Sequence, residues 1–155
     1  MAETTFNPPR RPSGLAKAAM SFQAFLLQRN WAGPLSEFLM VITTTGRKSG
    51  KRFSTPIGYI RDGDSLIALS VGGASNWYKN LLKTPEATLN VKGQSRRARA
   101  EMVKDPAERQ RIFELYKQHH ARAFDRLFGV TVDASAEALS KALATREFVR
   151  FHLDQ

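Results

Sequence analysis

Residues 43–56 read TTTGRKSGKRFSTP. The three threonines extend an apolar segment that begins at Phe38, and β-branched residues favour strands. A second strand is predicted from Arg52 to Ile60. Gly46 and Gly50 lie between the two segments and permit a tight turn. The stretch therefore predicts a hairpin with strands at 38–45 and 52–60.

The turn of this hairpin is strongly basic. Arg47, Lys48, Lys51 and Arg52 lie within six residues, and no acidic residue accompanies them. Such a concentration of positive charge opposes folding by itself, and a bound anion, most simply a phosphate, would balance it. The alternative is a solvated basic hairpin with no ligand. The stretch alone leaves both interpretations open.

The rest of the chain alternates between strand and helix patterns. Strands are predicted at 65–71, around 87–91, at 94–103 and at 148–153; helices are predicted at 14–30, 76–83, 106–124 and 133–144. Asp105 and Pro106 provide a cap and a first helical residue for the long helix. About six mostly antiparallel strands with helices around them indicate a small α+β barrel. We expect one domain at 13–155 after a flexible arm at 1–12.

Composition limits the chemistry. The 155 residues contain no cysteine, which excludes disulfides and thiolate chemistry. No metal site is predicted, because His119 and His120 are adjacent and no acidic residue stands at ligand spacing from them. No signal peptide or membrane-spanning run is apparent, so a cytoplasmic location is expected. The net charge of +10 suits nucleic acid, an anionic membrane surface or a polyanionic small ligand.

Because neither a catalytic triad nor a dinucleotide fingerprint is present, a bound cofactor should carry any redox step. Two further segments could help to hold it. The glycines of Ser70-Val71-Gly72-Gly73 allow a flat ring to approach the backbone. Asn76-Trp77-Tyr78 opens a helix whose N–H groups favour anions. Trp77 and Tyr78 either flank a ring or belong to the core.

Several motifs occur in one order: TTTGRKSGK, a Thr-Pro dipeptide, GYIRDGD, Gly-Gly and NWYKNL. Over about residues 38–103 this order resembles the deazaflavin (coenzyme F-420)-dependent nitroreductase and quinone reductase family. The resemblance implies a split β-barrel like that of FMN-binding proteins. It also implies a coenzyme with a phosphate and a polyglutamate tail, and hydride transfer to a quinone, a nitroaromatic compound or an activated enone.

The resemblance also implies site residues. Those expected to bind the coenzyme are Arg47, Lys48, Ser49, Gly50, Lys51, Thr55, Pro56, Ile57, Gly72, Gly73, Asn76, Trp77, Tyr78 and Asn80. Ser70 and Tyr116 are expected to contact the acceptor as catalytic residues. Where other members carry more tyrosines, this chain has His119, Arg122 and Phe124, whose roles are open. It also has Arg52-Phe53 where members carry Pro-Arg, which moves a cation by one residue in a strand.

Alternatives remain for partners and class. A homodimer is expected, since split barrels commonly pair. The helix predicted at 13–30 packs on the barrel or a second subunit, or lies on a membrane surface. A second functional interpretation is an FMN-binding oxidoreductase. A third is a non-enzymatic barrel that binds nucleic acid through Arg96, Arg97 and Arg99, but aromatic residues are not interleaved with these arginines as a stacking surface requires.

Overall fold

The computed structural model describes residues 38–155, which lie in one compact unit, Gly33–Gln155. The predicted arm at 1–12 and helix at 13–30 lie outside the described residues. The described elements are β1 (Leu39–Thr45), β2 (Arg52–Gly58), β3 (Ile60–Asp62), β4 (Ser65–Val71), α2 (Asn76–Lys83), β5 (Glu86–Val91), β6 (Gln94–Met102), α3 (Pro106–His119), α4 (Phe124–Phe128), α5 (Ala136–Ala144) and β7 (Arg146–Leu153).

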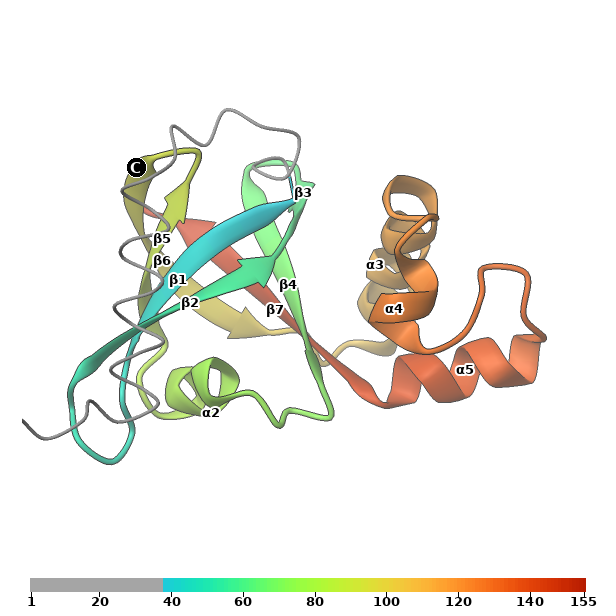
Figure 1. Ribbon diagram of the computed structural model, residues 1–155, viewed down its shortest axis with the longest axis horizontal. Helices are drawn as coiled ribbons and strands as arrows, with labels where there is room; N and C mark the ends of the chain where they lie inside the picture. Colours follow the sequence, from blue (N-terminus) through green and yellow to red (C-terminus); the bar gives the residue numbers. More distant parts are fainter. Residues whose placement is uncertain (1–37) are drawn as a thin grey trace, which may run out of the picture. The chain divides into compact units, whose positions relative to one another are not determined.

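The seven described strands form one antiparallel sheet in the order β2-β1-β5-β6-β7-β4-β3. β2 and β3 lie at opposite ends of this order, yet only Tyr59 separates them in the chain. The sheet must therefore curl until its two edges approach each other, and Figure 1 shows this curl. The N–H of Tyr59 donates to the carbonyl of Phe38 at 3.0 Å, which fixes the crossing point.

Alternation along β4 divides the apolar residues between two cores. Leu66 and Ala68 face the inside of the curled sheet, where they pack with residues of β1, β5, β7 and α2. Ile67 and Leu69 face the other side and pack under α3, α4 and α5. Alternate residues of 65–71 are expected to lie on opposite faces of a strand, and the structure confirms this division. In Figure 1, α2 lies at one end of the curled sheet, and the three later helices lie together beside β4 and β7.

Several predicted boundaries were wrong. The second strand ends at Gly58, and the next residues pair separately with β4, so the described sheet has seven strands. The helix predicted to reach Phe124 ends at His119, and His120 leaves the helical conformation with φ −129° and ψ 36°. The break allows both Phe124 and Phe128 of α4 to pack against Phe113, with ring centroids 5.3 and 4.8 Å away.

Two further errors concern the starts of α5 and β7. α5 begins at Ala136, because Ser135 caps it by accepting a hydrogen bond from the N–H of Ala138 at 3.2 Å. β7 begins at Arg146, two residues before the predicted start. The predicted start of α3 is confirmed: the side chain of Asp105 accepts from the N–H of Glu108 at 2.9 Å.

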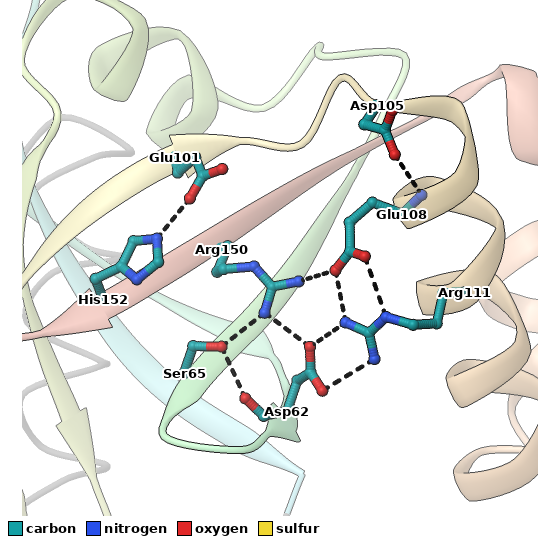
Figure 2. A network of polar contacts seen from close by, with 8 residues as sticks. All are labelled: Asp62, Ser65, Glu101, Asp105, Glu108, Arg111, Arg150 and His152. Carbon is teal, nitrogen blue, oxygen red and sulfur yellow. Dashed lines mark hydrogen bonds and ion pairs between the residues drawn. The ribbon is translucent and has the colours of Figure 1, made fainter.

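Four charged side chains join α3 to the sheet, and we call them the ion cluster: Asp62, Glu108, Arg111 and Arg150 (Figure 2). Arg150 of β7 donates to Asp62 at 2.7 Å and to Glu108 at 2.5 Å. Arg111 of α3 donates to both carboxylates as well. The two negative and two positive charges of the ion cluster thus cancel. The cluster lies at the Ser65 end of β4, whereas Gly72 and Gly73 follow the other end of this strand.

Candidate functional site

The basic turn closes as the sequence predicts. The N–H of Gly46 donates to the carbonyl of Lys51 at 2.7 Å, and the N–H of Gly50 donates to the carbonyl of Gly46 at 2.9 Å. We call residues 46–51 the basic loop. Its end residue Gly46 lies under the ring of Phe53, because a Cβ atom at Gly46 would come within 2.5 Å of that ring. Only glycine fits beneath the ring without displacement.

The basic loop is attached to α2 through Arg47. Asn80 accepts two hydrogen bonds from Arg47 on its Oδ1 atom, from the backbone N–H at 3.2 Å and from Nη1 at 3.0 Å. Asn76 accepts a third, from Nη2 at 3.4 Å. Lys83 donates to the carbonyl of Arg47 at 2.9 Å. The buried side chain of Asn80 also donates to Thr44 Oγ1 at 3.1 Å, which joins α2 to β1.

The charge of the basic loop is not compensated within residues 38–155. No acidic side chain of that range lies within 4.0 Å of Arg47, Lys48, Lys51 or Arg52. Lys48, Ser49 and Lys51 are exposed. A turn that presents ammonium groups, a hydroxyl and a guanidinium in one place is chemically suited to a phosphate or a carboxylate.

The register between β1 and β2 assigns each residue of β2 to a face. Phe53 pairs with Thr44, so both lie on the inner face that α2 covers. Arg52 pairs with Thr45 on the outer face, and its Nη2 atom donates to Thr88 of β5 at 3.0 Å. The predicted coenzyme residues on this strand are divided between the two faces: Thr55 and Ile57 lie on the inner face, and Pro56 lies on the outer face.

The end of β4 forms the second part of the candidate site. Ser70 lies on the inner face and is 1% exposed, and its Oγ atom is 2.9 Å from Ser75 Oγ. Gly72 has φ 59°, and no atom lies within 4 Å of the position where its Cβ would be. Gly73 is instead backed by the ring of Tyr78, 3.0 Å from its own Cβ position. Open space therefore adjoins Gly72.

Ser75 is a site candidate whose position before a predicted helix indicates only a cap residue. Its side chain makes no capping hydrogen bond to α2 and instead meets Ser70. It is half-buried, whereas Ser70 is buried, so Ser75 is the more accessible hydroxyl of the pair. The residues 72–76, GGASN, did not allow this pairing of Ser75 with Ser70 to be distinguished from helix capping.

The predicted aromatic residues belong to the cores. Trp77 and Tyr78 are 7% and 5% exposed and pack edge to face, with ring centroids 6.2 Å apart. This burial fits the alternative that both rings belong to the core, and their contact with the coenzyme stays a prediction. Both rings anchor α2 to the sheet. They thereby also position Asn76 and Asn80 of α2, which accept hydrogen bonds from Arg47.

Tyr116 is not brought together with Ser70. Tyr116 belongs to α3 and is buried in the core between helices α3–α5 and the sheet. Its ring stacks on that of Phe148, with ring centroids 5.8 Å apart. Phe148 pairs with Leu69, which lies on the face of β4 opposite to Ser70. Burial also raises the pKa of Tyr116. A catalytic role beside Ser70 is therefore not supported by its position.

The residues whose roles were open occupy different surroundings. His119 and Arg122 are exposed, and Phe124 is buried in the second core. His120 lies against Tyr116. The pKa of His120 is lowered first by burial and second by the charge of the nearby His119.

Among residues 38–155, no group of three or more potential metal-ligating side chains was found. Within the same range, no helix is long and apolar enough to cross a membrane.

A curled antiparallel sheet whose basic loop is held against α2 defines the class of the protein, a split β-barrel with a candidate anion site. The model of the F420H(2)-dependent quinone reductase family matches residues 22–133. The chain belongs to this family, and the resemblance predicted from the sequence is confirmed.

Relatives and solved structures agree. The chain is 35% identical over 78 residues to "Putative F420H(2)-dependent quinone reductase Rv3178" of Mycobacterium tuberculosis, a match covering 48% of this chain and 65% of that protein. It is 39% identical over 56 residues to F420H(2)-dependent quinone reductase Rv1261c of the same species, covering 34% of this chain and 38% of that protein. The chain thus matches less than two thirds of the length of these relatives.

Two solved structures share the fold. An F420-H2 dependent reductase (FDR-A) superimposes with a TM-score of 0.54 at 19% identity, covering 74% of this chain and 93% of that one. A FAD-binding protein from Mesorhizobium loti gives 0.54 at 16% identity, covering 85% and 89%. At these identities the likeness concerns the fold alone, and it confirms the predicted α+β split barrel.

Proposed function

We propose that this protein is an oxidoreductase that uses reduced coenzyme F-420 to reduce an electron-poor acceptor, with quinones as the first candidates. Family membership supports the coenzyme and the acceptor class. The observation that carries the proposal is the basic loop, whose positive charges have no acidic partner within residues 38–155. Nitroaromatic compounds and activated enones are further acceptors that the same chemistry would serve.

The residues present fit a coenzyme that joins a phosphate to a planar ring. The exposed side chains of Lys48, Ser49 and Lys51 would hold the phosphate, together with Arg47, which is bound to Asn80 of α2. The open space beside Gly72 would admit a ring close to the backbone. When bound, the reduced deazaflavin supplies a hydride from its C5 position.

The protein's own contribution is positioning and polarisation. Reduction of a quinone places negative charge on the acceptor oxygen, and a nearby hydrogen-bond donor stabilises that charge. Ser75 is such a donor at the first turn of α2, and Ser70 would orient it by accepting or donating across 2.9 Å. In this arrangement Ser70 acts on the acceptor through Ser75.

Titration with oxidised coenzyme F-420, followed by its fluorescence, tests the proposal directly. We expect saturable binding. In a separate assay that starts from the reduced coenzyme, we expect the coenzyme to be oxidised as menadione is reduced. Absence of binding at tens of micromolar would refute the proposal. The predicted homodimer would be tested by sedimentation of the same sample.

Two controls address the alternatives. Titration with FMN, and the colour of the purified protein, test the FMN interpretation. A labelled oligonucleotide tests the nucleic-acid interpretation, which requires an affinity that falls steeply with salt.

A further inference from the structure

Among residues 38–155, the side chains that accept hydrogen bonds from Arg47 are uncharged. Its backbone N–H and its Nη1 atom both donate to the amide oxygen of Asn80, and Nη2 donates to the amide oxygen of Asn76. The guanidinium is therefore fixed in place while its positive charge is retained. This pairing differs from the usual one for a half-buried arginine, which is a carboxylate.

Two arginines elsewhere in the chain are paired with carboxylates instead. In the ion cluster, Arg111 and Arg150 each donate to Asp62 and Glu108, and the charges cancel. At the basic loop a carboxylate would form stronger hydrogen bonds than an amide does. It would also remove the net charge that attracts an anion.

We propose that Asn80 is a positioning residue that orients Arg47 for an anionic ligand without neutralising it. This inference rests on the proposed function for the identity of the ligand, a phosphate-bearing coenzyme, but it concerns the electrostatics of the loop itself. Asn80 suits the task because it is buried, and because its amide group donates to Thr44 while accepting from Arg47. A neutral residue of this shape sets both the position of the loop and its charge.

The variant Asn80→Asp separates the position of the basic loop from its charge. Aspartate has the shape of asparagine and can accept from Arg47, and the Thr44 hydroxyl can rotate to donate to it. We expect the thermal stability of the variant to equal or exceed that of the wild type. We expect its affinity for oxidised coenzyme F-420 to fall about tenfold at low salt, with a smaller loss at high salt because the added charge is screened.

The matched control is Asn90→Asp, which makes the same change in net charge. Asn90 lies at the β5–β6 turn and pairs with Val41, toward the end of β1 remote from the basic loop. We expect its affinity for the coenzyme to be unchanged. A second test variant is Asn76→Asp, at the exposed acceptor of Arg47, for which we expect a smaller loss in the same direction.

Inorganic pyrophosphate, titrated by calorimetry, is a second probe that contains no deazaflavin. If the wild type binds pyrophosphate but not the coenzyme, and Asn80→Asp weakens pyrophosphate binding, the inference holds while the proposed function fails. If Asn80→Asp folds and binds both probes as tightly as the wild type, the inference is wrong. If that variant does not fold, Asn76→Asp decides by the same criterion. Failure of the wild type to bind either probe would overturn both proposals.

Discussion

Replacing Asp62 by asparagine should destabilise the protein in a manner that depends on pH. Asp62 accepts from Arg111 at 3.1 Å and from Arg150 at 2.7 Å. The hydrogen bond from Arg111, and then that from Arg150, lowers the pKa of Asp62 from 3.8 to about 2. The ionised form is therefore preferred in the folded state.

This pKa difference sets the size of the effect. A fall from 3.8 to about 2 corresponds to about 2.5 kcal/mol of stability at neutral pH. The side chain of Asp62 is 18% exposed and that of Arg111 is 45% exposed. Solvent screening at this partly open pair reduces the expected effect to about 1.5–2 kcal/mol. Since the folded pKa is depressed, this stabilisation is present above pH 3.8 and is lost as the pH falls towards 2.

Urea unfolding from pH 7 to pH 2 measures the effect. We expect Asp62→Asn to be about 1.5–2 kcal/mol less stable than the wild type at pH 7, with the difference disappearing near pH 2. Asp64→Asn is the control, because Asp64 is exposed in the same turn, and we expect a change within about 0.5 kcal/mol. A difference that stays constant across this pH range would refute the assignment to charge.

Three further predictions concern the candidate site. Lys48→Ala should weaken coenzyme binding by about 1–3 kcal/mol through loss of a charge-assisted contact. Arg52→Ala should leave coenzyme binding unchanged, because Arg52 lies on the outer face. Equal losses for the two variants in fluorescence titrations would contradict the assignment of the phosphate to the basic loop. Gly72→Ala and Gly63→Ala should each cost about 1 kcal/mol of stability in urea, since both glycines have φ 59°. Only Gly72→Ala should also weaken coenzyme binding, and equal binding by both variants would place the ring elsewhere. Ser70→Ala should retain coenzyme affinity and lower kcat with menadione; weaker binding with a normal kcat would contradict its role.

Local patterns predicted the features that depend on neighbouring residues in the chain. The Gly46–Gly50 turn, the alternation of β4 and the cap at Asp105 all follow from sequence spacing, and the structure contains them. The ion cluster could not be predicted in this way. Asp62 and Arg150 are 88 residues apart, and their contact depends on the pairing of β4 with both β3 and β7. The sequence showed Asp62 only as part of a turn.

The sequence left open whether Trp77 lies in the core, and the resemblance placed Tyr116 at the acceptor. Trp77 and Tyr116 carry the motif signals of a ligand site, yet each lies in a core whose position depends on which helices cover which face of the sheet. By contrast, Asn80 was predicted in the site, but its partner is Arg47 of the protein itself. A polar residue in a motif can serve a ligand by holding another residue, and sequence spacing does not distinguish the two cases.

The Arg52-Phe53 order has a consequence that follows from strand geometry alone. Pairing with β1 fixes the register of β2, so exchanging adjacent residues exchanges the faces on which their side chains lie. With arginine first, the cation lies on the outer face against Thr88, and the ring of Phe53 covers Gly46 on the inner face. Members with Pro-Arg would place the cation on the inner face at this level. In this chain, therefore, the cation that the inner face lacks at this level is supplied nearby by Arg47 of the basic loop and by Lys83 of α2, which donates to the carbonyl of Arg47.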